Sequence, residues 1–450
     1  MDALFKLTAT EAAAGIRSGK ISPVDLVEAC LARIEHLEPT LKAWVAVDAD
    51  GARRAARDCL ADAQAGRSRG PLHGVPVGLK DIFHARGFVT TAGAAPFFHE
   101  RPDADAASVA RLRRAGAIVL GKTTTTEFAN RDPADTRNPW NLEHTPGGSS
   151  SGSAAAVSAS MVPLALGSQT VGSTLRPAAY CGIVGLKPTH GRVSAAGVIP
   201  LAWSTDTVGI FGRSVADVAL ALDVLAGYDP VDLASVDMPS PNAAAALDRP
   251  ADPPRLGVPR QHLDRAEPDT VAHLDAVAER CRQAGALVKD VVLPESFDGL
   301  HVAGERVVQA EAAAYHADRF RAHADRYREK FRATLAAGMQ VTAVDYVPAL
   351  RQCRRFRRDL EALLSGFDGL LWPVAPGPAP RGLDSTGDAS FCAPWSYAGV
   401  PAVALPSGLA ASGLPLGIQL VGTPWREGPL LATARWMERL LAFEATPPLA

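Results

Sequence analysis

The sequence predicts an α/β protein with a mixed β-sheet that helices cover on both faces. Apolar, strand-like runs alternate with helical patterns along most of the chain, and 47% of the 450 residues are hydrophobic. No Gly/Ser/Pro-rich linker separates two independent halves. Alternation of this kind is typical of a sheet enclosed between helices. We therefore expect one large domain over residues 1–450, although the length would allow two or three.

The first helices carry clear start signals. Thr8 and Glu11 form a capping-box pattern, and Ser22 followed by Pro23 opens a second helix. Further helical patterns cover residues 106–115 and 270–284. Strand candidates are residues 75–79, 117–120, 162–166, 256–258, 287–292, 370–373, 403–406 and 417–421.

Two segments stand apart from this alternation. The Pro-rich residues 239–254 are expected to form a long surface connection within the domain. Residues 301–364 are long, rich in Arg and Ala, and mostly helical in pattern. This region either shapes the mouth of a substrate site or forms a purely structural helical layer.

Composition excludes several classes of function. The net charge of −2 and the pI of about 6.6 suggest no nucleic-acid or membrane partner. No apolar run reaches the roughly 18 residues of a membrane span, and the N-terminus lacks a signal pattern. We expect a cytoplasmic protein with a small-molecule substrate. The sequence does not decide whether the protein forms a homodimer.

Cysteine and histidine give no metal signature. The six Cys are scattered without ligand spacing, and the eleven His form no His-x-x-x-His pair. Cys181, with His190 nearby, is the one alternative nucleophile, but a buried structural Cys is favoured. We expect neither a metal nor a cofactor.

Two Gly/Ser-rich segments, residues 146–153 and 167–173, lie on either side of an apolar segment. Small residues let backbone N–H groups gather around one point, which suits a phosphate or a developing oxyanion. A flexible linker would not alternate with core residues, and no Lys follows Gly152 as a P-loop requires. Gly148 to Gly152 fits Gly-x-Ser-x-Gly, but the preceding residues 138–146 do not resemble the strand of a nucleophile elbow.

Lys80 is unusual because the chain has only 8 Lys against 38 Arg. It lies in the apolar, strand-like residues 74–83, where a buried charge is costly unless paired. An ion pair with Asp81 is disfavoured, since adjacent residues of a strand point to opposite faces. A buried lysine whose pKa is lowered can act as a general base.

Together these residues resemble the amidase signature family of serine amide hydrolases. The spacing of 24 positions between Ser149 and Ser173 matches the family pattern, as do residues 22–27, 72–83, 121–128, 138–192 and the C-terminal residues 399–402 and 413–419. The resemblance implies an α/β/α sandwich with a central mixed sheet. It also implies a Ser–cis-Ser–Lys triad, with Ser173 as nucleophile, Ser149 on a cis peptide as the bridging serine and Lys80 as base. The oxyanion hole would be formed by the N–H groups of Thr170, Val171, Gly172 and Ser173.

The chain departs from the family pattern around Ser173 and at residues 124–126. Gln169 replaces an Asp, Val171 replaces a Gly, and Arg176 follows Ser173 by three positions instead of two. Residues 124–126, all Thr, replace Asn-Met-Pro/Asp, which predicts a smaller and more polar pocket there. Thr125 and Arg176 are candidate substrate contacts.

The resemblance implies an amidase that forms an acyl-enzyme on neutral small amides, aryl amides or carbamates (urethanes). An ammonia-producing subunit of the glutamyl-tRNA amidotransferase type is the first alternative; residues 124–126 and Val171 argue against it. The second alternative is a non-catalytic binding protein of the same fold, which retention of all three triad residues disfavours.

Overall fold

The sheet predicted from the sequence is present in a computed structural model, which describes residues 4–248 and 252–449. Three residues of the Pro-rich segment, 249–251, therefore lie outside the described residues. The strands are β1 (Trp44–Val47), β2 (Pro76–Lys80), β3 (Ile118–Thr123), β4 (Leu164–Gln169), β5 (Val184–Lys187), β6 (Thr207–Gly212), β7 (Arg255–Pro259), β8 (Leu287–Val291), β9 (Gly369–Pro373), β10 (Ala402–Leu409) and β11 (Pro415–Val421).

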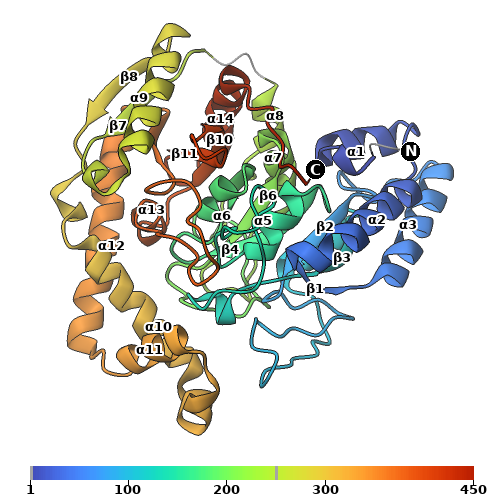
Figure 1. The fold of residues 1–450 in the computed structure, drawn as a ribbon, viewed down its shortest axis with the longest axis horizontal. Helices are drawn as coiled ribbons and strands as arrows, with labels where there is room; N and C mark the ends of the chain where they lie inside the picture. Colours follow the sequence, from blue (N-terminus) through green and yellow to red (C-terminus); the bar gives the residue numbers. More distant parts are fainter. Residues whose placement is uncertain (1–3, 249–251, 450) are drawn as a thin grey trace.

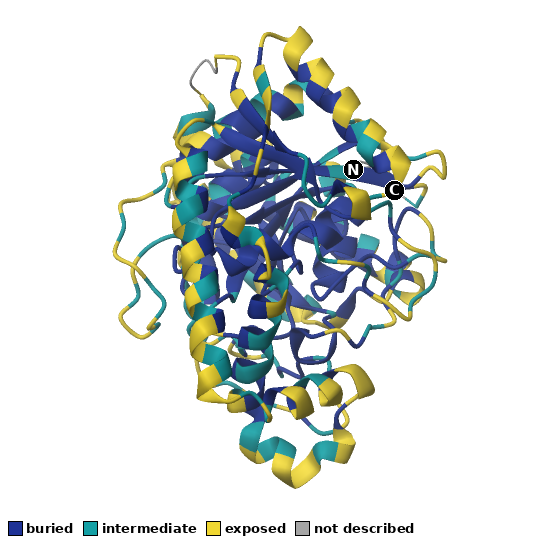
Figure 2. Cartoon of the chain, turned by 90° about the vertical axis from the view of Figure 1, so that its left-hand side faces the viewer, coloured by how far each residue is buried: buried dark blue, intermediate teal, exposed yellow. Residues whose placement is uncertain are grey.

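Within the described residues these strands form one 11-stranded mixed sheet, in the order β1-β3-β2-β4-β6-β5-β10-β11-β9-β7-β8. Strands β3, β2 and β4 run parallel, whereas β6 pairs antiparallel with β4 and β5. Every residue of β2, β3, β4, β5, β6 and β9 is buried. Since successive side chains point to opposite faces, both faces of the sheet must be covered. Figure 2 shows these strands buried at the centre, with exposed residues on the outer helices.

Helices supply that cover (Figure 1). They are α1 (Ala9–Arg17), α2 (Pro23–Leu41), α3 (Ala49–Gln64), α4 (Ala107–Arg114), α5 (Ser151–Ser158), α6 (Leu175–Tyr180), α7 (Val215–Leu225), α8 (Ala243–Leu247), α9 (Pro268–Gln283), α10 (Leu300–His323), α11 (Glu329–Gly338), α12 (Ala343–Leu364), α13 (Ala393–Tyr397) and α14 (Glu427–Leu441). The predicted starts are confirmed: Thr8 and Glu11 form a capping box before α1, and Ser22 caps α2, which begins at Pro23.

All eight strand candidates are confirmed, with small differences at their ends. Strands β1, β5 and β6 were not predicted. Strand β1 has four residues, three of them exposed, at the edge of the sheet. Strands β5 and β6 each contain glycine, which weakens a strand signal in sequence.

The helical prediction for residues 301–364 is confirmed, because α10, α11 and α12 fill this region, with α10 packed against both α11 and α12. Figure 1 shows these helices at one end of the molecule, extending beyond the sheet. No helix among the described residues is long and apolar enough to cross a membrane.

The parallel strands β2 and β4 bring the two predicted active segments together. Leu79 is paired with Leu166, so Lys80 and Ser168 lie at the same edge of the sheet, where both strands end. Helix α5 begins just after Ser149 and packs against β2 and β4. A Cβ on Gly152 would lie 2.1 Å from the carbonyl oxygen of Ala43, so only glycine permits this close packing.

Candidate active site

Lys80 lies at the end of β2 with no exposed surface. Its Nζ donates hydrogen bonds to Ser149 Oγ and to Ser168 Oγ, both at 2.7 Å. No carboxylate of the described residues lies within ion-pair distance of it; Asp81 instead pairs with Lys122 at 2.8 Å. Burial lowers the pKa of Lys80 to about 7, while the negative charge of Asp206 acts in the opposite direction. A large fraction of Lys80 is therefore neutral near neutral pH.

Ser149 directly follows a cis peptide bond, Gly148–Ser149. The chain around this bond is held from two sides. Thr126 N–H donates to the carbonyl oxygen of Ser149 at 3.2 Å, and Arg176 Nη2 donates to that of Gly148 at 2.7 Å. These two hydrogen bonds hold the backbone on either side of the cis bond, and the hydroxyl of Ser149 accepts its hydrogen bond from Lys80.

Ser173 lies in the turn between β4 and α6 and lines a large cavity. Among the described residues, its hydroxyl has no hydrogen bond to Ser149 or to any other group. The N–H groups of residues 171–173 also donate to no acceptor within the described residues, and these residues line the same cavity. The turn thus presents unpaired donors beside a hydroxyl, an arrangement suited to a negatively charged oxygen.

Gln169 stabilises this turn by hydrogen bonds. The sequence alone did not show what role this residue has in place of the Asp of the family pattern. Its Oε1 accepts hydrogen bonds from Thr174 N–H and Leu175 N–H, each at 2.9 Å, at the start of α6. Its Nε2 donates to Ser396 Oγ at 2.9 Å, and Ser396 Oγ donates to the carbonyl oxygen of Val171 at 2.7 Å. A carboxylate could accept the first two bonds but could not donate the third. Ser396 carried no sequence signal, because it is 225 positions from Val171.

Arg176 lines the cavity but is 6% exposed. Besides Gly148, its guanidinium donates to the carbonyl oxygen of Gly387 at 2.7 Å and to Thr386 Oγ1 at 3.1 Å. Burial lowers the pKa of this guanidinium. Arg176 thus ties the cis peptide to residues 386–387, and most of its donors are already used.

The cavity beside Ser173 has a volume of about 710 Å³. Its wall includes three basic residues, Arg131, Arg176 and Lys330, and two acidic residues, Glu305 and Asp388. Arg131 and Glu305 pair with each other at 2.9 Å. Part of the wall comes from α10 and α11, in the helical region of residues 301–364, since it includes His301, Glu305 and Ala333.

Thr125 is buried, and its hydroxyl donates to the carbonyl oxygen of Thr126. It is absent from the cavity wall, to which this part of the chain contributes residues 129–131 instead. The substrate contact suggested for Thr125 stays a prediction. Two backbone bonds join residues 124–126 to the serine segment: the carbonyl oxygen of Thr124 accepts from Gly152 N–H, and Thr126 N–H donates to the carbonyl oxygen of Ser149.

Two residues of this centre were missed from the sequence: Ser168 and Asp206. Ser168 stood in a recognised Gly/Ser segment but matched no motif position. Asp206 precedes β6, which was not predicted. Its Oδ1 accepts a 2.5 Å hydrogen bond from Thr170 Oγ1, and its Oδ2 accepts from Leu201 N–H and Ala202 N–H. Burial raises the pKa of Asp206 to about 6.

Asp206→Asn is expected to move the acid limb of the pH–rate profile to lower pH. The charge of Asp206 favours the ammonium form of Lys80, so its removal lowers the pKa of Lys80. If neutral Lys80 is the active form, activity then begins at lower pH. The measurement is kcat/KM against pH. An unmoved limb in Asp206→Asn would contradict the coupling.

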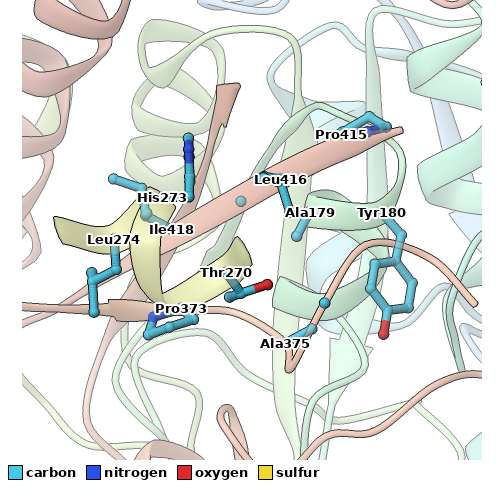
Figure 3. A pocket seen from close by; sticks show the side chains of 12 residues that line it. Ala179, Tyr180, Thr270, His273, Leu274, Pro373, Ala375, Pro415, Leu416 and Ile418 are labelled. Carbon is cyan, nitrogen blue, oxygen red and sulfur yellow. The ribbon is translucent and has the colours of Figure 1, made fainter. Parts of the chain in front are cut away.

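Neither the small gap in Figure 3 nor the cysteines of the described residues combine a buried lysine with serines and a cavity. The small gap in Figure 3, lined by Tyr180, Thr270 and His273, holds only about 10 Å³, room for about one water molecule. All six cysteines are buried and unpaired, including Cys181, whose pKa burial raises. Within residues 4–248 and 252–449, no group of three or more His, Cys, Asp or Glu could hold a metal ion.

The sequence of this chain is similar to a known protein family and to individual known proteins. Residues 25–431 match the family model Amidase. A glutamyl-tRNA(Gln) amidotransferase subunit from Anaeromyxobacter sp. (strain K) is 38% identical over 483 aligned residues, which cover 99% of this chain and 98% of that protein.

Two solved structures are also close. One comes from an unexpected vestigial protein complex that reveals the evolutionary origins of an s-triazine catabolic enzyme (TM-score 0.90, 30% identity, covering 99% of this chain and 100% of that chain). The other is the native peptide amidase from Stenotrophomonas maltophilia (TM-score 0.85, 31% identity, covering 99% of each chain).

Proposed function

The chain belongs to the amidase family, whose members act on carbon–nitrogen bonds, and from this premise we propose that it hydrolyses small neutral amides or carbamates through Lys80, Ser149 and Ser173. One observation carries the proposal. A fully buried lysine without an ion-pair partner among the described residues donates to Ser149 at 2.7 Å, beside a cavity that contains Ser173. A lysine in this state can accept a proton near neutral pH.

In the proposed reaction, Ser173 attacks the carbonyl carbon while its proton passes to Ser149 and the proton of Ser149 passes to Lys80. The negative oxygen accepts hydrogen bonds from the N–H groups of residues 170–173. Collapse of this intermediate returns a proton through the same residues to the leaving amine, and the acyl group stays on Ser173. Water then hydrolyses the ester. The relay needs contact between Ser149 and Ser173, which we expect to form when substrate is bound, since catalytic hydrogen bonds often tighten only then.

The wall of the cavity supports a neutral substrate. Its basic and acidic residues nearly balance, Arg131 is paired with Glu305, and Arg176 already donates to two carbonyl oxygens. A substrate carboxylate would have to compete for these donors. We therefore expect neutral amides, aryl amides and carbamates to be preferred over carboxylate-bearing ones.

A second candidate function is that of an ammonia-producing component of an amidotransferase. The 38% identity to a glutamyl-tRNA(Gln) amidotransferase subunit over nearly the full length of both chains favours it. Two assays separate the candidates: glutamine hydrolysis, and copurification of the tagged chain with partner proteins. Stable partners together with glutaminase activity would favour the amidotransferase; turnover of amides by the isolated chain would favour the amidase. A non-catalytic protein would fail to react with a serine-directed fluorophosphonate probe.

An acyl-enzyme on Ser173 is expected to partition between water and hydroxylamine. Both reactions start from the same ester, so the ratio of hydroxamate to acid should depend on the acyl group alone. An anilide and an ester with the same acyl group should therefore give equal ratios. Product analysis and mass spectrometry of the trapped adduct make the measurement. Ratios that change with the leaving group, or an adduct on another residue, would exclude this mechanism.

A further inference from the structure

A second cavity, of about 630 Å³, borders the same centre. It shares three wall residues, Ala129, Thr170 and Leu201, with the cavity that contains Ser173. Its wall also includes Ser168, the serine that accepts a hydrogen bond from Lys80, and Asp206. The mechanism proposed above makes no use of this cavity.

Most of the remaining wall is apolar. It includes Val198, Ile199, Pro200, Trp203, Val231 and Leu233. Leu233 is fully exposed and Val231 is 78% exposed, so the cavity opens to solvent beside an apolar rim. Trp203 and Tyr315 meet edge to face, with ring centroids 6.2 Å apart. A cavity of this size and lining suits a small ligand with a substantial apolar body.

The charges of the wall have one sign. Asp206 and Asp232 line it, whereas the described residues contribute no Lys or Arg to its wall and one histidine, His84, whose Nε2 lies 2.8 Å from Glu100 Oε2. Asp232 accepts from Ala195 N–H and Ala234 N–H, in a loop near the rim. Asp206 has no Lys, Arg or His of the described residues within ion-pair distance. A partly buried carboxylate without a cation is a complementary partner for a positively charged group.

We propose that this second cavity binds an apolar primary amine, with its ammonium group on Asp206 and its alkyl or aryl body against Val198, Ile199 and Trp203. The ammonium would complete the hydrogen bonds of the Asp206 carboxylate, and the aromatic rings of Trp203 and Tyr315 favour a cation nearby. Such an amine has two sources. It is either a free amine from solution or, if the proposed amide hydrolysis is correct, the leaving group of an N-alkyl or N-aryl amide.

The test uses benzylamine and isothermal titration calorimetry at pH 8, on the full chain and on its Ser173→Ala variant. Both should bind it saturably, since binding needs no turnover. Benzyl alcohol, which lacks the charge, and methylamine, which lacks the apolar body, should each bind at least about tenfold more weakly. Absence of saturable benzylamine binding would overturn the proposal, whatever the chain hydrolyses.

Benzylamine affinities of single-residue variants test whether the amine binds in the second cavity. Asp206→Asn should weaken benzylamine binding at least about tenfold, because a charge-assisted contact is lost. The matched control is Asp388→Asn, which removes a carboxylate from the Ser173 cavity and should leave the affinity unchanged. Ala195→Trp, which adds bulk to the wall of the second cavity and keeps Asp206, should also abolish binding. Unchanged affinity in both Asp206→Asn and Ala195→Trp, or a loss only in Asp388→Asn, would overturn the assignment.

Kinetics then distinguish the two sources. If the cavity receives the leaving group, an N-benzyl amide should have a lower KM than the primary amide with the same acyl group, and Ala195→Trp should remove the difference. If the amine comes only from solution, the two KM values should respond equally to Ala195→Trp. Should no amide be hydrolysed, benzylamine binding still tests the cavity, so failure of the two proposals is distinguishable.

Discussion

Ser173→Ala is expected to lower kcat/KM by at least about four orders of magnitude, as removal of a nucleophile does in other serine hydrolases. The fold should persist, because the hydroxyl faces the cavity and makes no hydrogen bond among the described residues. The measurements are kcat/KM on an activated amide and the thermal unfolding temperature. Cys181→Ala is the control for the alternative nucleophile, and should keep its activity because this thiol is fully buried.

Ser149→Ala should also lose several orders of magnitude in rate, since in the proposed relay its hydroxyl, which accepts a hydrogen bond from Lys80, passes the proton of the nucleophile to Lys80. Ser151→Ala is the matched control. That neighbouring hydroxyl donates to the carbonyl oxygen of Gly147 and does not contact Lys80, so its loss should affect stability more than rate. Near wild-type activity in Ser149→Ala would show that the Gly/Ser segment is structural.

Lys80→Met should lower kcat/KM by at least about three orders of magnitude. It should also remove the dependence of the remaining rate on pH near neutrality. In the proposed mechanism the neutral amine is the active form, and burial lowers the pKa of Lys80 to about 7. Activity should therefore be low below pH 7, rise through that pH and level off above it. An unperturbed lysine, with a pKa of about 10.4, would still be rising far into the alkaline range.

Methionine is chosen because it fills a similar volume without a charge, so the core around β2 should remain packed. The measurement is kcat/KM from pH 5 to about 10, with unfolding monitored at each pH. A flat wild-type profile, or a Lys80→Met variant that retains the limb, would exclude Lys80 as the base. Lys122→Met offers a contrast: this lysine is paired with Asp81, so its loss should reduce stability rather than remove the limb.

The sequence by itself determined the fold class, the three proposed catalytic residues and most of the sheet. Eight strands could be predicted, and most of them are apolar runs whose residues are buried. Lys80, Ser149 and Ser173 could be found because their motifs are local and their spacing is specific. The cis bond before Ser149, which the family resemblance implied, is also present.

Contacts between distant segments were decided only by the tertiary structure. Pairing of β4 with β6 brings Asp206 to Thr170, 36 positions away, and pairing of β2 with β4 brings Ser168 to Lys80, 88 positions away. The amide of Gln169 acquires its role from Ser396, 227 positions away. The cavity wall likewise includes residues 129–131 and not Thr125, whose side chain is buried. A motif records local constraints, whereas such contacts depend on strand order and helix packing, which leave no periodic or compositional trace in the residues that meet.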